Sequence, residues 1–172
     1  MLHTGAHGRR RRWWPTKLRQ FARHVTARVS PAERASLDGW LTPTEARLFD
    51  SMHIADRRHG LDVVASLRAM QATDRDIVVA GLLHDAGKGA TGVWPRVAWS
   101  LGEAWGPWVV RVAARLPAMR GPLARLRDHA ELSAEMAAAA GCSSRTVGLI
   151  RHQDAPIDPE FGELLRLADE AN

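Results

Sequence analysis

The sequence predicts an all-α fold, and three observations support that prediction. Helix-start signals recur along the chain, and apolar residues repeat at the three- and four-residue spacing of a helix. No stretch of useful length alternates between apolar and polar residues as a β-strand does. The 172 residues, 45% hydrophobic and 25% charged, are typical of one globular domain. We therefore expect eight or nine helices around a single core.

Two helix starts are the clearest. Ser30-Pro31-Ala32-Glu33 and Thr42-Pro43-Thr44-Glu45 each place a hydroxyl at the N-cap, proline at the first helical position and glutamate at the third. The helix after Thr42 is expected to break near His53 and to resume until about Met70. Other helices are expected over residues 16–29, 73–87, 94–117 (as one or two helices), 122–140, 143–152 and 158–169.

Charge is unevenly placed along the chain. Residues 1–28 hold eight of the 24 basic residues and none of the 19 acidic ones, so the remaining residues carry a net charge of −3. We interpret residues 1–15 as a disordered basic arm, residues 16–42 as N-terminal helices packed on the domain, and residues 43–172 as the domain itself. The arginine run beside two tryptophans leaves two alternatives open: a solvated arm, or a weak contact with acidic lipid or nucleic acid through residues 9–19.

Several classes of protein are disfavoured. The single Cys142 excludes an internal disulfide and fits a reducing compartment. The most apolar stretch, residues 93–116, contains four charged residues, so no transmembrane helix is expected. The arginine run is followed by Trp-Trp-Pro-Thr-Lys instead of an apolar segment, which disfavours a secretory signal. We expect a cytoplasmic protein.

Four tryptophans lie between residues 94 and 108. We interpret them as residues that pack in the core, in preference to residues that line a nucleobase pocket or contact a membrane.

The strongest local signal is the segment from Ala80 to Gly89. It places His84 and Asp85 side by side at the end of an apolar helix, with Ile77 and Ala80 on the same face as the histidine. A buried polar pair needs partners, and a cation satisfies both side chains at once.

This segment resembles a known family. Leu-Leu-His84-Asp85-Ala-Gly-Lys88 looks like the central motif of the HD superfamily of metal-dependent phosphohydrolases. His59, 25 residues earlier in Arg-His-Gly-Leu-Asp, resembles the first histidine of that family, and Asp169, which ends Leu-Leu-Arg-Leu-Ala-Asp, resembles its closing aspartate. The resemblance covers about residues 43–172. It implies an HD-domain helical bundle whose metal is held by His59, His84, Asp85 and Asp169. His53 is the rival for the first position.

The resemblance also bears on a second metal ion. His129 and His152 lie between the His-Asp pair and the last aspartate, where two-metal members have further histidines, and Asp85 would then bridge the two ions. The alternative is that His129 and His152 contact the substrate or support the ligands. Gln153 stands where a second consecutive histidine is frequent. The chain has no tyrosine and so lacks the Gly-Tyr-Pro signature of cyclic-di-GMP phosphodiesterases, which argues against that substrate.

The donor set and the resemblance together predict a reaction. Two imidazoles with two carboxylates favour Mn, Fe, Co, Ni or Zn over Mg. We expect hydrolysis of a phosphoester or phosphoanhydride in a phosphorylated, nucleotide-like small molecule. Asp85, or alternatively Glu131, would take a proton from water, and Lys88 would stabilise charge on phosphate oxygens, unless Lys88 is only a lysine at a helix C-terminus. The competing hypothesis is a regulatory, non-catalytic HD module that binds metal and a nucleotide or a partner protein.

Overall fold

The computed structural model describes residues 27–172, and this part of the chain is all helical, as predicted. The predicted arm (1–15) and residues 16–26 lie outside the described residues. The described part has ten α-helices, more than the eight or nine expected, and no strand. They are α2 (Pro31–Ala35), α3 (Pro43–Ser51), α4 (Ile54–Ala69), α5 (Arg75–Leu83), α6 (Val93–Trp105), α7 (Trp108–Ala113), α8 (Arg120–Arg127), α9 (His129–Ala139), α10 (Ser144–Arg151) and α11 (Gly162–Glu170), with the 3-10 helix η1 (Ala86–Lys88) between α5 and α6.

Both predicted capping boxes are present and begin their helices where the sequence indicates. The side chains of Ser30 and Thr42 each accept a hydrogen bond from the backbone N–H of the glutamate three residues later. The predicted break near His53 is also confirmed, because α3 ends at Ser51 and the His53 ring caps α4 by accepting from the Ala55 N–H. These starts were predictable because capping is a local interaction.

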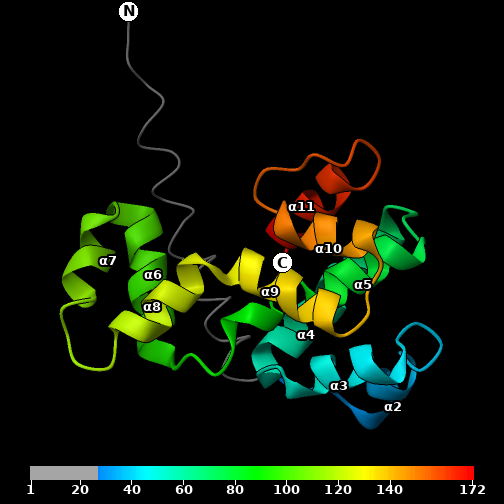
Figure 1. Ribbon diagram of the computed structural model, residues 1–172, viewed down its shortest axis with the longest axis horizontal. Helices are drawn as coiled ribbons and strands as arrows, with labels where there is room; N and C mark the ends of the chain where they lie inside the picture. The colour runs from blue at the N-terminus through cyan, green and yellow to red at the C-terminus, as the bar shows by residue number, and fades with distance from the viewer. Residues whose placement is uncertain (1–26) are drawn as a thin grey trace, which may run out of the picture.

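Helix α5 lies at the centre of the bundle, where it contacts α3, α4, α10 and α11 (Figure 1). Every residue from Ile77 to Leu83 is buried. Burial of each large aliphatic side chain contributes about 1.5–3 kcal/mol, so this helix anchors the core. Its C-terminal end therefore delivers the next two residues, His84 and Asp85, into the interior.

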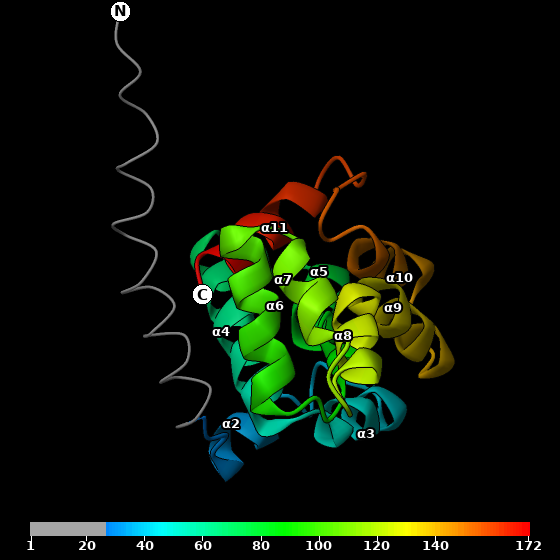
Figure 2. The same ribbon diagram turned by 90° about the vertical axis from the view of Figure 1, so that its left-hand side faces the viewer.

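Helices α6, α7 and α8 form a lobe on one side of the molecule (Figures 1 and 2). The main cluster of buried apolar residues takes members from α3, α4, α5, α9, α10 and α11, and within residues 27–172 it takes none from these three helices. The core-packing interpretation of the tryptophans is therefore wrong for three of the four. Trp94, Trp105 and Trp108 are 75%, 51% and 53% exposed, and Trp99 is half-buried.

The predicted helix over 122–140 is divided in two at Asp128, which ends α8 and precedes α9. At this point the His129 ring bonds the Leu126 carbonyl through Nδ1 at 2.8 Å. A continuous helix would use that carbonyl to accept from the backbone N–H of Ala130. The break sets the direction in which the His129 side chain leaves the helix.

Two other boundaries differ from the prediction, and one agrees with it. The helix over 73–87 ends at Leu83, and the chain then turns through the His-Asp pair into η1. The segment 94–117 forms two helices, within the one or two expected, and they are separated at Gly106, whose φ of 108° is unfavourable for other residues. The last helix begins at Gly162 instead of Asp158, because the Asp158 carboxylate accepts from the N–H groups of residues 160 and 161 and stabilises a turn.

None of the helices in residues 27–172 combines the length and the apolar character needed to cross a bilayer.

Candidate metal centre

The His84–Asp85 pair is buried at the end of α5, and each residue is only 2% exposed. His84 Nδ1 lies 3.0 Å from the Gly81 carbonyl, which can only accept, so Nδ1 carries a proton and donates it. The opposite nitrogen, Nε2, faces Asp85 Oδ1 and Asp169 Oδ1, each at 3.5 Å. Within the described residues, neither His84 Nε2 nor Asp85 Oδ1 has a hydrogen-bond partner. The unpartnered acceptor atoms of His84 and Asp85 are thus buried next to the partly exposed Asp169 carboxylate, an arrangement that a cation or a proton stabilises.

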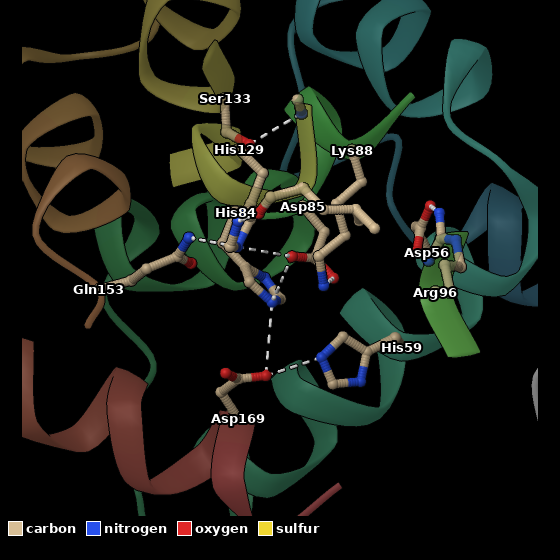
Figure 3. Close-up of polar contacts among 12 residues, drawn as sticks. Asp56, His59, His84, Asp85, Lys88, Arg96, His129, Ser133, Gln153 and Asp169 are labelled. Carbon is tan, nitrogen blue, oxygen red and sulfur yellow. Dashed lines mark hydrogen bonds and ion pairs between the residues drawn. The ribbon is translucent and has the colours of Figure 1, made fainter. Parts of the chain in front are cut away.

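Two further side chains complete the cluster from distant parts of the chain (Figure 3). His59 from α4 places Nε2 2.7 Å from Oδ1 of Asp169, which comes from α11. The ligand atoms of His59, His84 and Asp169 all lie within 4.8 Å of one another, as in a group that could hold a metal ion. Asp85 adjoins this group through its Oδ1 atom. The structure therefore brings His59, His84 and Asp169 into one group and places Asp85 beside His84.

The pKa values of these groups reflect a site that attracts positive charge. Burial alone would lower the pKa of His84, but the carboxylates of Asp85 and Asp169 outweigh it and raise that pKa to about 9. Burial alone would raise the pKa of Asp85, but Lys88 and His84 hold it well below its ordinary value. The nearby imidazoles of His59 and His84 likewise depress the pKa of Asp169 against the effect of burial. Both carboxylates are thus ionised at neutral pH and available to a cation.

Lys88 lies beside the cluster at the end of η1. Its Nζ atom is 2.6 Å from Asp85 Oδ2, and about a quarter of its side chain remains exposed. Burial lowers the pKa of Lys88, but the Asp85 carboxylate raises it by more, so the ammonium stays charged. This contact distinguishes Lys88 from a solvated lysine at a helix end.

The two further candidate histidines have different surroundings. His129 Nε2 lies 3.8 Å from Asp85 Oδ1 and 3.2 Å from Gln153 Nε2. Because His129 Nδ1 donates to the Leu126 carbonyl, the Nε2 atom accepts from the Gln153 amide. Within the described residues, no hydrogen bond or ion pair links the side chain of the neighbouring His152 to the cluster. The structure therefore places His129 beside Asp85 and Gln153 beside His129, and it shows no such contact for His152.

Two residues were alternatives in the sequence, His53 as the first histidine ligand and Glu131 as a proton acceptor, and both have other contacts in the structure. His53 caps α4, as described above. Glu131, the alternative proton acceptor, is exposed, and its carboxylate accepts from Arg151 at 3.0 Å.

Three residues that support the cluster were missed in the sequence. Asp56, one turn before His59 on α4, is 3% exposed and forms two 2.7 Å bonds with the Arg96 guanidinium. Ser133, one turn after His129, accepts from the Gly87 N–H at 2.8 Å. The one available signal was helical spacing, since Asp56 and Ser133 lie three and four residues from predicted ligands on their helices.

Gly87 allows η1 and α9 to approach each other closely. A Cβ atom at this position would lie 2.5 Å from the His129 carbonyl oxygen and 2.6 Å from the Ser133 nitrogen. The glycine after the His-Asp pair therefore brings Asp85 and His129 together.

Comparison with known proteins gives no match to this chain: no family model, no curated protein and no solved structure is similar to it. The resemblance to the HD superfamily consequently rests on the motif residues and their order.

Proposed function

We propose that this chain is a metal-dependent phosphohydrolase of the HD type. The observation that carries the proposal is the meeting of the buried His84 Nε2 with two ionised carboxylates, the buried Asp85 and the partly exposed Asp169, with His84 Nε2 and Asp85 Oδ1 both lacking a hydrogen-bond partner. A polar cluster of this kind is costly unless a cation or a proton occupies it. The proposed reaction is hydrolysis of a phosphoester or phosphoanhydride in a nucleotide-like small molecule.

His59, His84, Asp85 and Asp169 would hold one divalent ion. Imidazole with carboxylate suits Mn, Fe, Co, Ni or Zn better than Mg. When bound, such an ion lowers the pKa of water and polarises a phosphoryl oxygen. A second ion would need the Nε2 atom of His129, but Gln153 already donates to that atom, so we favour one tight site.

The remaining roles belong to residues around the ligands. Lys88 is charged, partly exposed and fixed by Asp85, so its ammonium can contact a phosphate oxygen and balance the charge that develops there. Asp85 orients Lys88 through Oδ2 while Oδ1 faces the ligand cluster. The low pKa of Asp85 makes it a weak base at neutral pH, and we therefore assign it to orienting these groups.

The test is phosphate release by the full chain with added Mn²⁺. The substrates are a panel of mono-, di- and polyphosphorylated nucleotides and a simple aryl phosphate. Wild type and His152→Ala should release phosphate from at least one substrate. His84→Ala should be slower by a factor of about a hundred or more, because removal of even a residue that only supports a metal ligand costs about 10–100-fold.

His152→Ala is the matched control, since it removes the same kind of side chain from a position that, within the described residues, makes no hydrogen bond or ion pair with the cluster. Absence of phosphate release from every substrate, with metal bound to the wild type, would favour the regulatory module that binds metal and a nucleotide or partner protein without turnover.

A further inference from the structure

The lobe formed by α6, α7 and α8 exposes an apolar stripe bordered by arginines. Trp108, Val112 and Leu116 follow one another at four-residue spacing, so they share one face of α7 and the turn after it. They are 53%, 52% and 58% exposed. Trp108 donates its ring N–H to the Trp105 carbonyl at 3.0 Å, which satisfies its polar atom and leaves the ring facing solvent. Proteins rarely expose large apolar side chains together unless the surface binds something.

Three arginines lie beside this stripe. Arg111 and Arg115 precede Val112 and Leu116 by one residue, and Arg120 opens α8. All three are exposed, and within the described residues none of their guanidinium groups forms a hydrogen bond or an ion pair. They line an open hollow of about 660 Å³ together with Leu116. We call this surface the Trp–Arg patch: Trp108, Val112 and Leu116 with Arg111, Arg115 and Arg120.

The composition of the surrounding segment indicates the kind of partner. Residues 104–127 contain five arginines and no acidic residue, and they contain no serine, threonine, asparagine or glutamine. A surface that reads nucleic acid commonly uses such neutral polar side chains, together with arginine and lysine, to contact base edges and phosphates. A second copy of the chain would place like charges face to face. Arginine, tryptophan and aliphatic residues on one surface instead match the boundary of an anionic bilayer, where phosphates lie above acyl chains.

We propose that the Trp–Arg patch docks the protein on an anionic membrane surface. Arg111, Arg115 and Arg120 bind the phosphates of lipid headgroups at the hollow, while Trp108, Val112 and Leu116 enter the boundary between headgroups and acyl chains. Within residues 27–172, the helices of this lobe contribute nothing to the main buried cluster, and they lie together on one side of the molecule (Figure 1), so docking requires no rearrangement of the bundle. The inference is independent of the proposed enzymatic activity.

The test is co-sedimentation of the full chain with vesicles of phosphatidylcholine, with and without phosphatidylserine. Wild type should bind the vesicles that contain phosphatidylserine and bind neutral vesicles much less. The variant Arg111→Gln with Arg115→Gln should bind about 25-fold less tightly, since each arginine near an anionic surface strengthens binding roughly fivefold. The matched control, Arg47→Gln with Arg68→Gln, loses the same charge from α3 and α4 and should bind like wild type.

The apolar part is tested separately with Trp108→Ser and Val112→Ser. Both residues are exposed, so the variants should fold like wild type, which thermal unfolding checks, but they should bind anionic vesicles more weakly. Equal losses in the patch and control variants would overturn the proposal. It would also fail if the arginine variant lost binding to a DNA oligonucleotide but kept vesicle binding. Self-association that Trp108→Ser abolishes, without vesicle binding by the wild type, would assign the patch to a dimer instead.

Discussion

Asp169 Oδ1 lies 2.7 Å from His59 Nε2, although 110 residues separate the two in the chain. The contact joins the last helix, α11, to α4, and Asn172 strengthens this junction by donating to Ser66 Oγ at 2.9 Å. The ligand cluster is therefore complete only when α11 has docked on the bundle. Ligand binding and folding of the C-terminal helix should be coupled, since a bound ion stabilises the folded state alone.

Lys88 should stabilise the metal-free protein by balancing the buried charge of Asp85. Lys88→Met leaves that carboxylate without its cation, and breaking a buried pair costs about 3–5 kcal/mol. Because a quarter of the Lys88 side chain is exposed, we expect a smaller loss of about 2 kcal/mol in the free energy of unfolding. Urea unfolding with a chelator present measures it.

The matched control for Lys88→Met is Arg127→Met, which breaks the exposed pair with Asp128 and should change the free energy of unfolding little. Equal losses in the two variants would show that Asp85 does not depend on Lys88.

The Asp56–Arg96 pair should fix the loop between η1 and α6 against α4. Arg96 binds Asp56 through two nitrogens and the Thr91 hydroxyl through Nε. Arg96→Ala leaves the Asp56 charge buried and should cost about 3 kcal/mol. Combining it with Asp56→Ala should cost clearly less than the sum of the single changes, with a coupling energy of about 2 kcal/mol.

A double-mutant cycle measured by urea unfolding determines this coupling. The exposed pair Arg166 and Glu163 provides the reference cycle, in which we expect a coupling below about 1 kcal/mol. If the losses in the free energy of unfolding caused by Asp56→Ala and Arg96→Ala simply add, the pair does not fix the loop between η1 and α6 against α4.

Gly87 should be intolerant of any side chain. Gly87→Ala places a Cβ against backbone atoms of α9, which have no room to move aside, and overpacking of this kind costs about 1–3 kcal/mol. Gly148→Ala in α10 is the control, because nothing lies within 4 Å of the new Cβ and alanine favours a helix interior by about 0.5–1 kcal/mol. Thermal unfolding should therefore shift in opposite directions in the two variants. A shift in the same direction would contradict the close approach of η1 and α9.

The pH dependence of Cys142 alkylation should differ between the folded and unfolded chains. Burial, followed by the nearby Glu45 carboxylate, raises the pKa of the Cys142 thiol from 9.0 to about 12. Only the thiolate reacts with iodoacetamide. In the folded protein, the alkylation rate should therefore still rise steeply with pH between about 9 and 11. In the chain unfolded in urea, the rate should level off over the same range. The stability that this raised pKa contributes is fully present below pH 9.0 and is lost as pH rises toward 12. If the alkylation rate of the folded protein levels off near pH 9, the Cys142 thiol does not have the buried environment described here.

Local signals predicted the helix starts, whereas tertiary contacts decided the rest. Ser30 and Thr42 could be read as caps because their partners lie three residues away. The break at Asp128 could not be predicted, because nothing in the apolar pattern of residues 122–140 indicates it. Arg96 and its partner Asp56 are 40 residues apart, and no spacing rule connects them. The exposure of Trp105 and Trp108 likewise depends on where α6 and α7 lie relative to the core.

The candidate ligands were identified by resemblance to a family motif, and their proximity depends on the fold. His84 and Asp85 could be predicted as a buried pair from the apolar helix before them. Neither composition nor periodicity would have paired them with Asp169. His129 and His152 illustrate the limit, since both are histidines in the expected interval and only His129 reaches Asp85.

The central claim is that His59, His84, Asp85 and Asp169 hold one divalent metal ion. Equilibrium dialysis of the full chain against Mn²⁺ or Zn²⁺, followed by elemental analysis, tests it most directly. We predict one tightly bound ion per chain in the wild type and in His152→Ala, and loss of that ion in His84→Ala. A wild type that retains no ion, or a His84→Ala variant that retains as much as the wild type, would contradict the account.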